Sequence, residues 1–104
     1  MLLHTVFFWL RDDLDAASIK SFEKALFNLF KIKGIKFKYI GKPAGTRRPV
    51  IDSTYSYKLV IGFDDIKGHD YYQDCEAHKE FVAGYSKYWV KVQVYDGEEY
   101  RIGG

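Results

Sequence analysis

The sequence has little cysteine and little proline. Cys75 is the only cysteine among 104 residues, so one chain cannot form an internal disulfide and shows no sign of an oxidising compartment. We therefore expect a cytoplasmic protein. With only two prolines and no low-complexity tract, the chain is also unlike a disordered one. Its length suits one hydrophobic core but not two, which predicts a single domain over residues 1–104.

The sequence also lacks a large net charge and a membrane-spanning apolar run. The net charge is +2, from 16 Lys and Arg against 14 Asp and Glu, and the basic residues are scattered, so we expect no nucleic-acid partner. Residues 2–10 are apolar, but His4 interrupts them and residues 11–13 are charged. This pattern is unlike a signal peptide or a membrane span, and it predicts a strand and no membrane partner.

Aromatic residues are abundant instead. Eight Phe, nine Tyr and two Trp give the chain its 19 rings, and each ring can bury a large area. So much ring surface requires a partner or a pocket.

Hydrophobic periodicity predicts the order β-α-β-β-α-β. Strands are expected at residues 2–10, 35–42, 54–63 and 89–96, a first helix at 16–31 capped by Asp15, and a helical segment at 65–87 that is broken near 74–76. This order is the split βαβ arrangement, a ferredoxin-like α+β fold with a four-stranded antiparallel sheet and helices on one face.

The first strand is apolar on both faces. Leu2, Val6 and Phe8 alternate with Phe7 and Trp9, whereas two helical layers can cover only one face of the sheet. We therefore expect a homodimer in which a second copy of the chain covers the open sheet face.

Several segments in fixed order resemble the stress-responsive A/B barrel (Dabb) family. They are residues 4–10 (HTVFFWL), 55–60 (YSYKLV) with Phe63, 72–78 (YQDCEAH) with Phe81 and Val82, and Val92, Val94, Tyr95 and Asp96 near the end. The resemblance spans nearly the whole chain. It implies a homodimeric α+β barrel with a cavity between sheet and helices in each protomer, and an activity that is unassigned for most members.

The resemblance also implies candidate catalytic residues. Plant polyketide cyclases of similar layout use a Tyr and a His six residues apart, which correspond here to Tyr72 and His78. A neutral imidazole can remove a proton next to a ketone while a phenol donates to the developing enolate oxygen. The chain departs from the family where His-Pro-x-His is common, since it has Cys75 and Glu76 in the first two positions, and it has Tyr57 where a histidine is common.

Each candidate has a structural alternative. Tyr72 and His78 are equally compatible with a structural hydrogen bond across the helix break. For His4, a hydrogen-bonded core residue is favoured over a ligand or a base. If the helices cover its face, His4 lines the cavity, and we expect Tyr57 and Phe81 to contribute to ligand binding as well. His69 follows Gly68 in a polar stretch, so we expect it to face water, and with no dense ligand pattern we expect no metal and no cofactor.

Three functions remain open. The favoured hypothesis is a homodimer that binds a small apolar or polyketide-like molecule in an aromatic-lined cavity. The alternatives are a cyclase-like lyase or cofactor-free monooxygenase that uses His78 and Tyr72 as an acid/base pair, and a structural or stress-protective homo-oligomer without a ligand.

Overall fold

A computed structural model describes residues 1–103 and contains one sheet covered by helices on one side. The elements in chain order are β1 (Leu2–Leu10), α1 (Ala16–Leu29), β2 (Phe37–Gly41), β3 (Tyr57–Phe63), α2 (Ile66–Asp74), α3 (Glu76–Tyr85), a short 3-10 turn (Ser86–Tyr88) and β4 (Trp89–Glu98). This order confirms the predicted β-α-β-β-α-β arrangement and its broken second helix.

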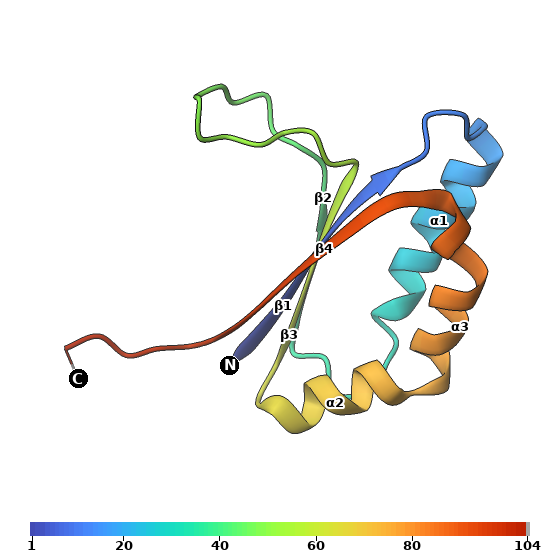
Figure 1. Ribbon diagram of the computed structural model, residues 1–104. Helices are drawn as coiled ribbons and strands as arrows, with labels where there is room; N and C mark the ends of the chain where they lie inside the picture. The colour runs from blue at the N-terminus through green and yellow to red at the C-terminus, as the bar shows by residue number, and fades with distance from the viewer. Residues whose placement is uncertain (104) are drawn as a thin grey trace.

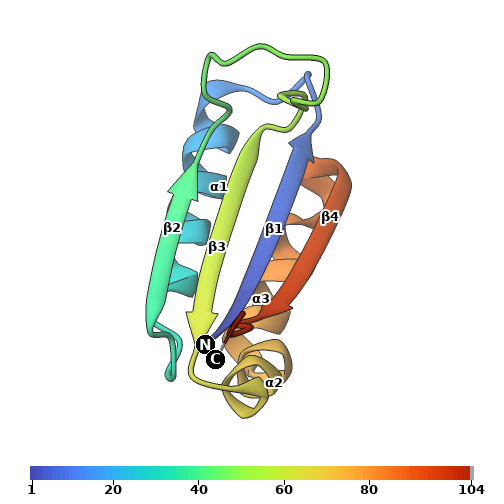
Figure 2. The ribbon, with the colours of Figure 1, turned by 90° about the vertical axis from the view of Figure 1, so that its left-hand side faces the viewer.

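The four strands form an antiparallel sheet in the order β2-β3-β1-β4, which Figure 2 shows edge to edge. All three helices lie on the same side of this sheet (Figure 1). The arrangement confirms the ferredoxin-like α+β fold, with β1 in the interior of the sheet.

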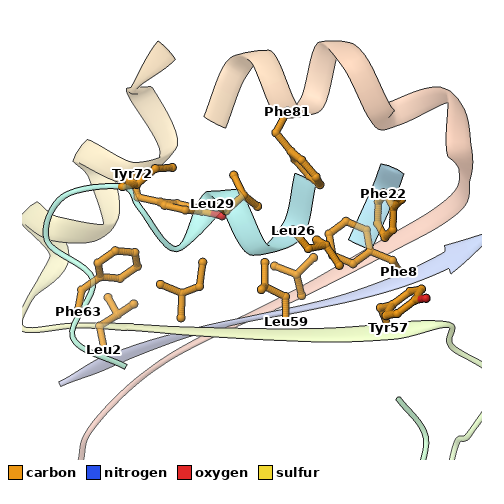
Figure 3. Packing of buried hydrophobic residues seen from close by; sticks show 13 residues of the cluster. Leu2, Phe8, Phe22, Leu26, Leu29, Tyr57, Leu59, Phe63, Tyr72 and Phe81 are labelled. Atoms are coloured by element: carbon orange, nitrogen blue, oxygen red, sulfur yellow. The ribbon is translucent and has the colours of Figure 1, made fainter. Parts of the chain in front are cut away.

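The core lies between the sheet and the helices. Alternate residues of β1 and β3 point into it, and α1 contributes Phe22, Leu26 and Leu29, which share one face because of their helical spacing. Figure 3 shows these α1 residues facing Phe8 and Leu59 of the sheet. The predicted cap also forms, since the Asp15 carboxylate accepts a hydrogen bond from the backbone N–H of Ser18 at 2.7 Å.

The opposite face of the sheet has no helix over it (Figure 1). Strand register places Leu3, Phe7, Phe37, Tyr39 and Tyr95 on this side. Phe37 and Tyr39 remain 45% and 47% exposed. The aromatic residues of β2 alternate with Lys38 and Ile40, and they lie on the uncovered face rather than against the helices.

The loop between β2 and β3 extends away from the helices at the top of Figure 1, and its last residues return over the uncovered face. The Trp9 indole donates a hydrogen bond to Thr54 Oγ1 at 2.8 Å, and the Tyr55 ring lies edge-on to Phe7. These contacts place Thr54 and Tyr55 against side chains of β1 rather than in a strand, and β3 begins at Tyr57 and not at residue 54 as predicted. Within residues 1–103, no helix is long and apolar enough to cross a membrane.

Candidate functional site

A cavity of about 270 Å³ lies between the sheet and the α2–α3 pair. Apolar side chains line most of it, from β1 (Val6 and Phe8), from α3 (Phe81 and Val82) and from the last strand (Trp89, Val92 and Val94). Val82 and Val94 both line the cavity and are both partly exposed, so the cavity opens between α3 and the edge strand β4. The predicted ligand-binding residue Phe81 is thus a wall of this cavity.

Polar side chains gather at one end of the cavity. They are His4, His69, Tyr72, Gln73, His78 and Asp96. Tyr72 and His78 flank the break between α2 and α3 at Cys75, and their ring centroids lie 4.8 Å apart. The break is the reason that residues six positions apart can meet, because in a continuous helix they would point to different sides.

Burial sets the protonation states of this pair. Tyr72 is only 1% exposed, and its burial raises the pKa of the phenol, so the hydroxyl keeps its proton. Burial, with a smaller contribution from the nearby His4, lowers the pKa of His78, which favours the neutral imidazole. The cavity therefore contains a hydrogen-bond donor beside a neutral base.

The Tyr72 hydroxyl is not committed to a protein partner. No hydrogen bond from this hydroxyl to another of residues 1–103 contributes to its pKa. Among residues 1–103, every fully buried polar side-chain atom has a hydrogen-bond partner. Since the Tyr72 hydroxyl has none, it is not fully buried and must reach the cavity surface. The hydroxyl is therefore free to donate a hydrogen bond to a bound molecule.

His4 is buried and hydrogen-bonded on both ring nitrogens. It lies opposite Asp96 across the β1–β4 ladder, and its Nδ1 is 2.6 Å from Asp96 Oδ1. Its Nε2 lies 3.4 Å from the side-chain nitrogen of Gln73 in α2. Burial lowers the pKa of His4, and the hydrogen bond with Asp96 opposes that shift. His4 is thus a hydrogen-bonded core histidine and also lines the cavity, so both alternatives given for it apply.

The expectation that His69 faces water was wrong. Its side chain is only 15% exposed, its Nε2 lies 3.5 Å from Asp96 Oδ2, and its ring is edge-on to that of His4. The N-terminal turn of α2 packs this side chain against His4, near the start of β1, and against Phe63, at the end of β3. The prediction that His69 is exposed came from its polar neighbours Gly68 and Asp70, but these neighbours do not determine the direction of its side chain.

Tyr57 lies outside the cavity. It is buried at the other end of the sheet, where its hydroxyl donates a hydrogen bond to the Glu23 carboxylate. Burial is the main cause that raises the pKa of Tyr57, and the Glu23 carboxylate adds to it.

A separate open groove of about 310 Å³ lies between α1 and α3, and none of the three histidines lines it. The polar end of the first cavity is therefore the candidate functional site.

The sequence patterns indicate no functional role for Asp96, Gln73 or His69. The position of Asp96 is the one available signal. It follows Val92 and Val94 in the alternation that points inward, and a charged residue on an inward face needs a partner. His69 and Gln73 are four residues apart on one face of α2, but nothing local shows which way that face points.

These features define a ferredoxin-like α+β protein with an interior cavity whose polar end holds three histidines. The chain matches the Stress responsive A/B Barrel Domain (Dabb) family over residues 2–99, and it belongs to this family. The sequence resemblance is thereby confirmed.

Solved structures share the fold. A dabb family protein with a ferredoxin-like fold from Mesorhizobium loti has a TM-score of 0.78 and 24% identity, with 96% of this chain and 97% of that chain covered. A dimeric ferredoxin-like protein of unknown function from Thermobifida fusca has a TM-score of 0.76 and 20% identity over 92% and 88%. The hydroxynitrile lyase of Passiflora edulis has a TM-score of 0.77 and 16% identity over 96% of each chain. No curated protein matches the sequence.

Proposed function

We propose that this protein binds a small, mostly apolar molecule with one carbonyl or hydroxyl oxygen in the cavity between the sheet and α2–α3. The observation that carries the proposal is the division of the cavity into apolar walls and one polar end. Apolar walls supply affinity through burial, and a few polar groups fix orientation, which is typical of small-molecule sites. The free hydroxyl of Tyr72 is the group we expect to meet the ligand oxygen.

A cavity-filling variant tests the proposal. Val92→Phe adds a ring to the cavity wall, whereas Val90→Phe makes the same change on the same strand at an exposed position outside the cavity. With 2-acetonaphthone as probe, we expect saturable binding and thermal stabilisation of the parent and of Val90→Phe, and loss of both in Val92→Phe. Equal binding by all three proteins, or binding by none, would contradict the proposal.

A second function, acid/base catalysis, is supported by the contact between Tyr72 and His78. A neutral His78 could accept a proton from the carbon next to a bound carbonyl, while Tyr72 donates a hydrogen bond to the oxygen on which charge develops. A lyase or a cofactor-free monooxygenase would use such a step. The Passiflora edulis protein of the same fold is a hydroxynitrile lyase, which is compatible with this hypothesis. At 16% identity, however, the similarity between the two chains shows the fold alone.

Proton exchange separates catalysis from binding. If the pair is catalytic, the protein should accelerate exchange of the methyl protons of 2-acetonaphthone in deuterated water, followed by NMR. His78→Ala should remove the acceleration and Tyr72→Phe should reduce it, while both variants still bind the ketone. Binding without accelerated exchange would favour a binding protein over an enzyme.

We also propose that two copies associate through the uncovered sheet face. The support is physical, because Leu3, Phe37 and Tyr39 expose apolar surface on a face that no helix covers. A self-complementary face of this kind suits a two-fold dimer. The Thermobifida fusca protein of the same fold is described as dimeric.

A further inference from the structure

Three potential metal-binding groups meet at the polar end of the cavity. One donor atom from each of His4, His69 and Asp96 can be chosen so that all three lie within 4.8 Å of one another. They come from three separate elements, since His4 is on β1, His69 on α2 and Asp96 on β4. The fold therefore assembles them, and sequence spacing gives no indication of the cluster.

If the His69 imidazole is neutral, its two ring nitrogens cannot both donate a hydrogen bond to their carboxylate neighbours. Its Nδ1 lies 3.2 Å from Asp70 Oδ1, and its Nε2 lies 3.5 Å from Asp96 Oδ2, so the ring stands between two carboxylates. A neutral imidazole has only one N–H to donate. When that N–H is given to Asp70, the Nε2 lone pair faces the Asp96 carboxylate, and two acceptors oppose each other.

A cation between these acceptors would resolve the conflict. We propose that His4, His69 and Asp96 bind a single divalent transition-metal ion at the polar end of the cavity. Imidazole nitrogens with one carboxylate favour an ion such as Zn²⁺, Co²⁺ or Fe²⁺ over Mg²⁺ or Ca²⁺, which prefer oxygen ligands.

The spacing fits such an ion after small side-chain movements. Ligand atoms at Zn²⁺ distances in a tetrahedron are roughly 3.3 Å apart. Asp96 Oδ1 lies 2.6 Å from His4 Nδ1, and Asp96 Oδ2 lies 3.5 Å from His69 Nε2. Since the three donor atoms lie within 4.8 Å of one another, the side chains would have to close around the ion. The Asp96 side chain is 42% exposed and can adjust. Coordination positions left open by the three ligands would face the cavity.

Supporting contacts for two ligands are already in place. Metal-bound histidines usually donate their other N–H to an oxygen, which fixes the tautomer and the ring plane. The Asp70 carboxylate is placed to accept from His69 Nδ1. The Gln73 amide contacts His4 Nε2, and after a flip it presents its oxygen to that nitrogen. The proposed ion does not depend on the small molecule proposed above.

Cobalt provides a direct test, because its visible spectrum reports coordination. The full chain, first treated with a chelator, should bind one Co²⁺ per chain, develop visible absorption bands, and lose them when Zn²⁺ is added. His69→Gln and Asp96→Asn should each weaken binding by at least about 100-fold, beyond the 10- to 100-fold that loss of a supporting partner costs. His78→Gln is the matched control, since it removes a histidine of the same cavity and keeps the three ligands.

Nitrogen-15 NMR of the imidazoles gives an independent readout. Zn²⁺ should shift the ring nitrogens of His4 and His69 and leave those of His78 nearly unchanged. The proposal is overturned if the parent takes up no Co²⁺, or if His69→Gln and Asp96→Asn bind it as tightly as the parent. It is also overturned if His69 stays protonated on both nitrogens in the presence of Zn²⁺, because a protonated ring would itself bridge the two carboxylates.

Discussion

The Tyr72 and His78 rings pack against each other across the break between α2 and α3, with centroids 4.8 Å apart. The contact orients a protonated phenol and a neutral imidazole toward the same cavity, and burial maintains both protonation states. Because neither state depends on a ligand, both can be measured in the free protein.

The first prediction concerns the pKa of His78. An NMR titration of the chelator-treated protein should give a value below the ordinary 6.5, because burial disfavours the charged ring. The unfolded chain then binds a proton at a pH where the folded one does not. The contribution of His78 to stability is therefore complete above about pH 6.5 and is lost as the pH falls from there through the lowered folded-state pKa.

Urea unfolding between pH 7.5 and 5 should show this dependence. His78→Gln cannot take up the proton, so its stability should fall less steeply over the same range than that of the parent. A His78 resonance that titrates at or above 6.5 would contradict the burial argument.

The second prediction compares two buried tyrosines. The hydroxyl of Tyr57 donates to the Glu23 carboxylate, whereas that of Tyr72 has no such partner among residues 1–103. Tyr57→Phe should therefore cost about 1–3 kcal/mol of unfolding free energy, since it removes a hydrogen bond to a charged group. Tyr72→Phe should change stability by less than about 1 kcal/mol.

Denaturant unfolding of the two variants measures both values. A Tyr72→Phe protein that loses more than about 2 kcal/mol of unfolding free energy would indicate that the hydroxyl is a structural group. In that outcome, lost activity in the same variant would say nothing about catalysis.

Sequence patterns predicted the features that depend on neighbouring residues. The two apolar faces of residues 2–10, the cap at Asp15 and the helix break near residue 75 are all properties of short segments, and all three are present. The order of elements then limited the topology to one familiar arrangement, which the sheet order confirms.

The polar end of the cavity depends on long-range register. His4 and Asp96 are 92 residues apart, and they meet because β1 and β4 pair with Val6 opposite Val94. A shift of one residue would move Asp96 to the other face of the sheet. Since no local pattern determines this register, the pair could not be predicted from spacing, and the direction of His69 could not be predicted from its polar neighbours.

The third prediction concerns the start of α1. Asp15→Ala should cost about 1 kcal/mol of unfolding free energy, because it removes the acceptor for the Ser18 N–H and an anion at the positive end of the helix. The same substitution at the exposed neighbour Asp12 should stay within about 0.5 kcal/mol. Thermal or urea unfolding distinguishes the two, and equal losses would show that the cap adds nothing to stability.

The fourth prediction tests association through the uncovered sheet face. Phe37 lies on that face and is 45% exposed, while Phe27 lies on the outer side of α1 and is 68% exposed. A charged residue buried in an interface without a partner is strongly unfavourable, but on a free surface it costs little. In light scattering at micromolar concentration, we expect the parent and Phe27→Glu to be dimers and Phe37→Glu to be a folded monomer. A monomeric parent, or a Phe37→Glu protein that dimerises as well as Phe27→Glu, would mean that the open face does not bind a second copy and that its aromatic residues have another role.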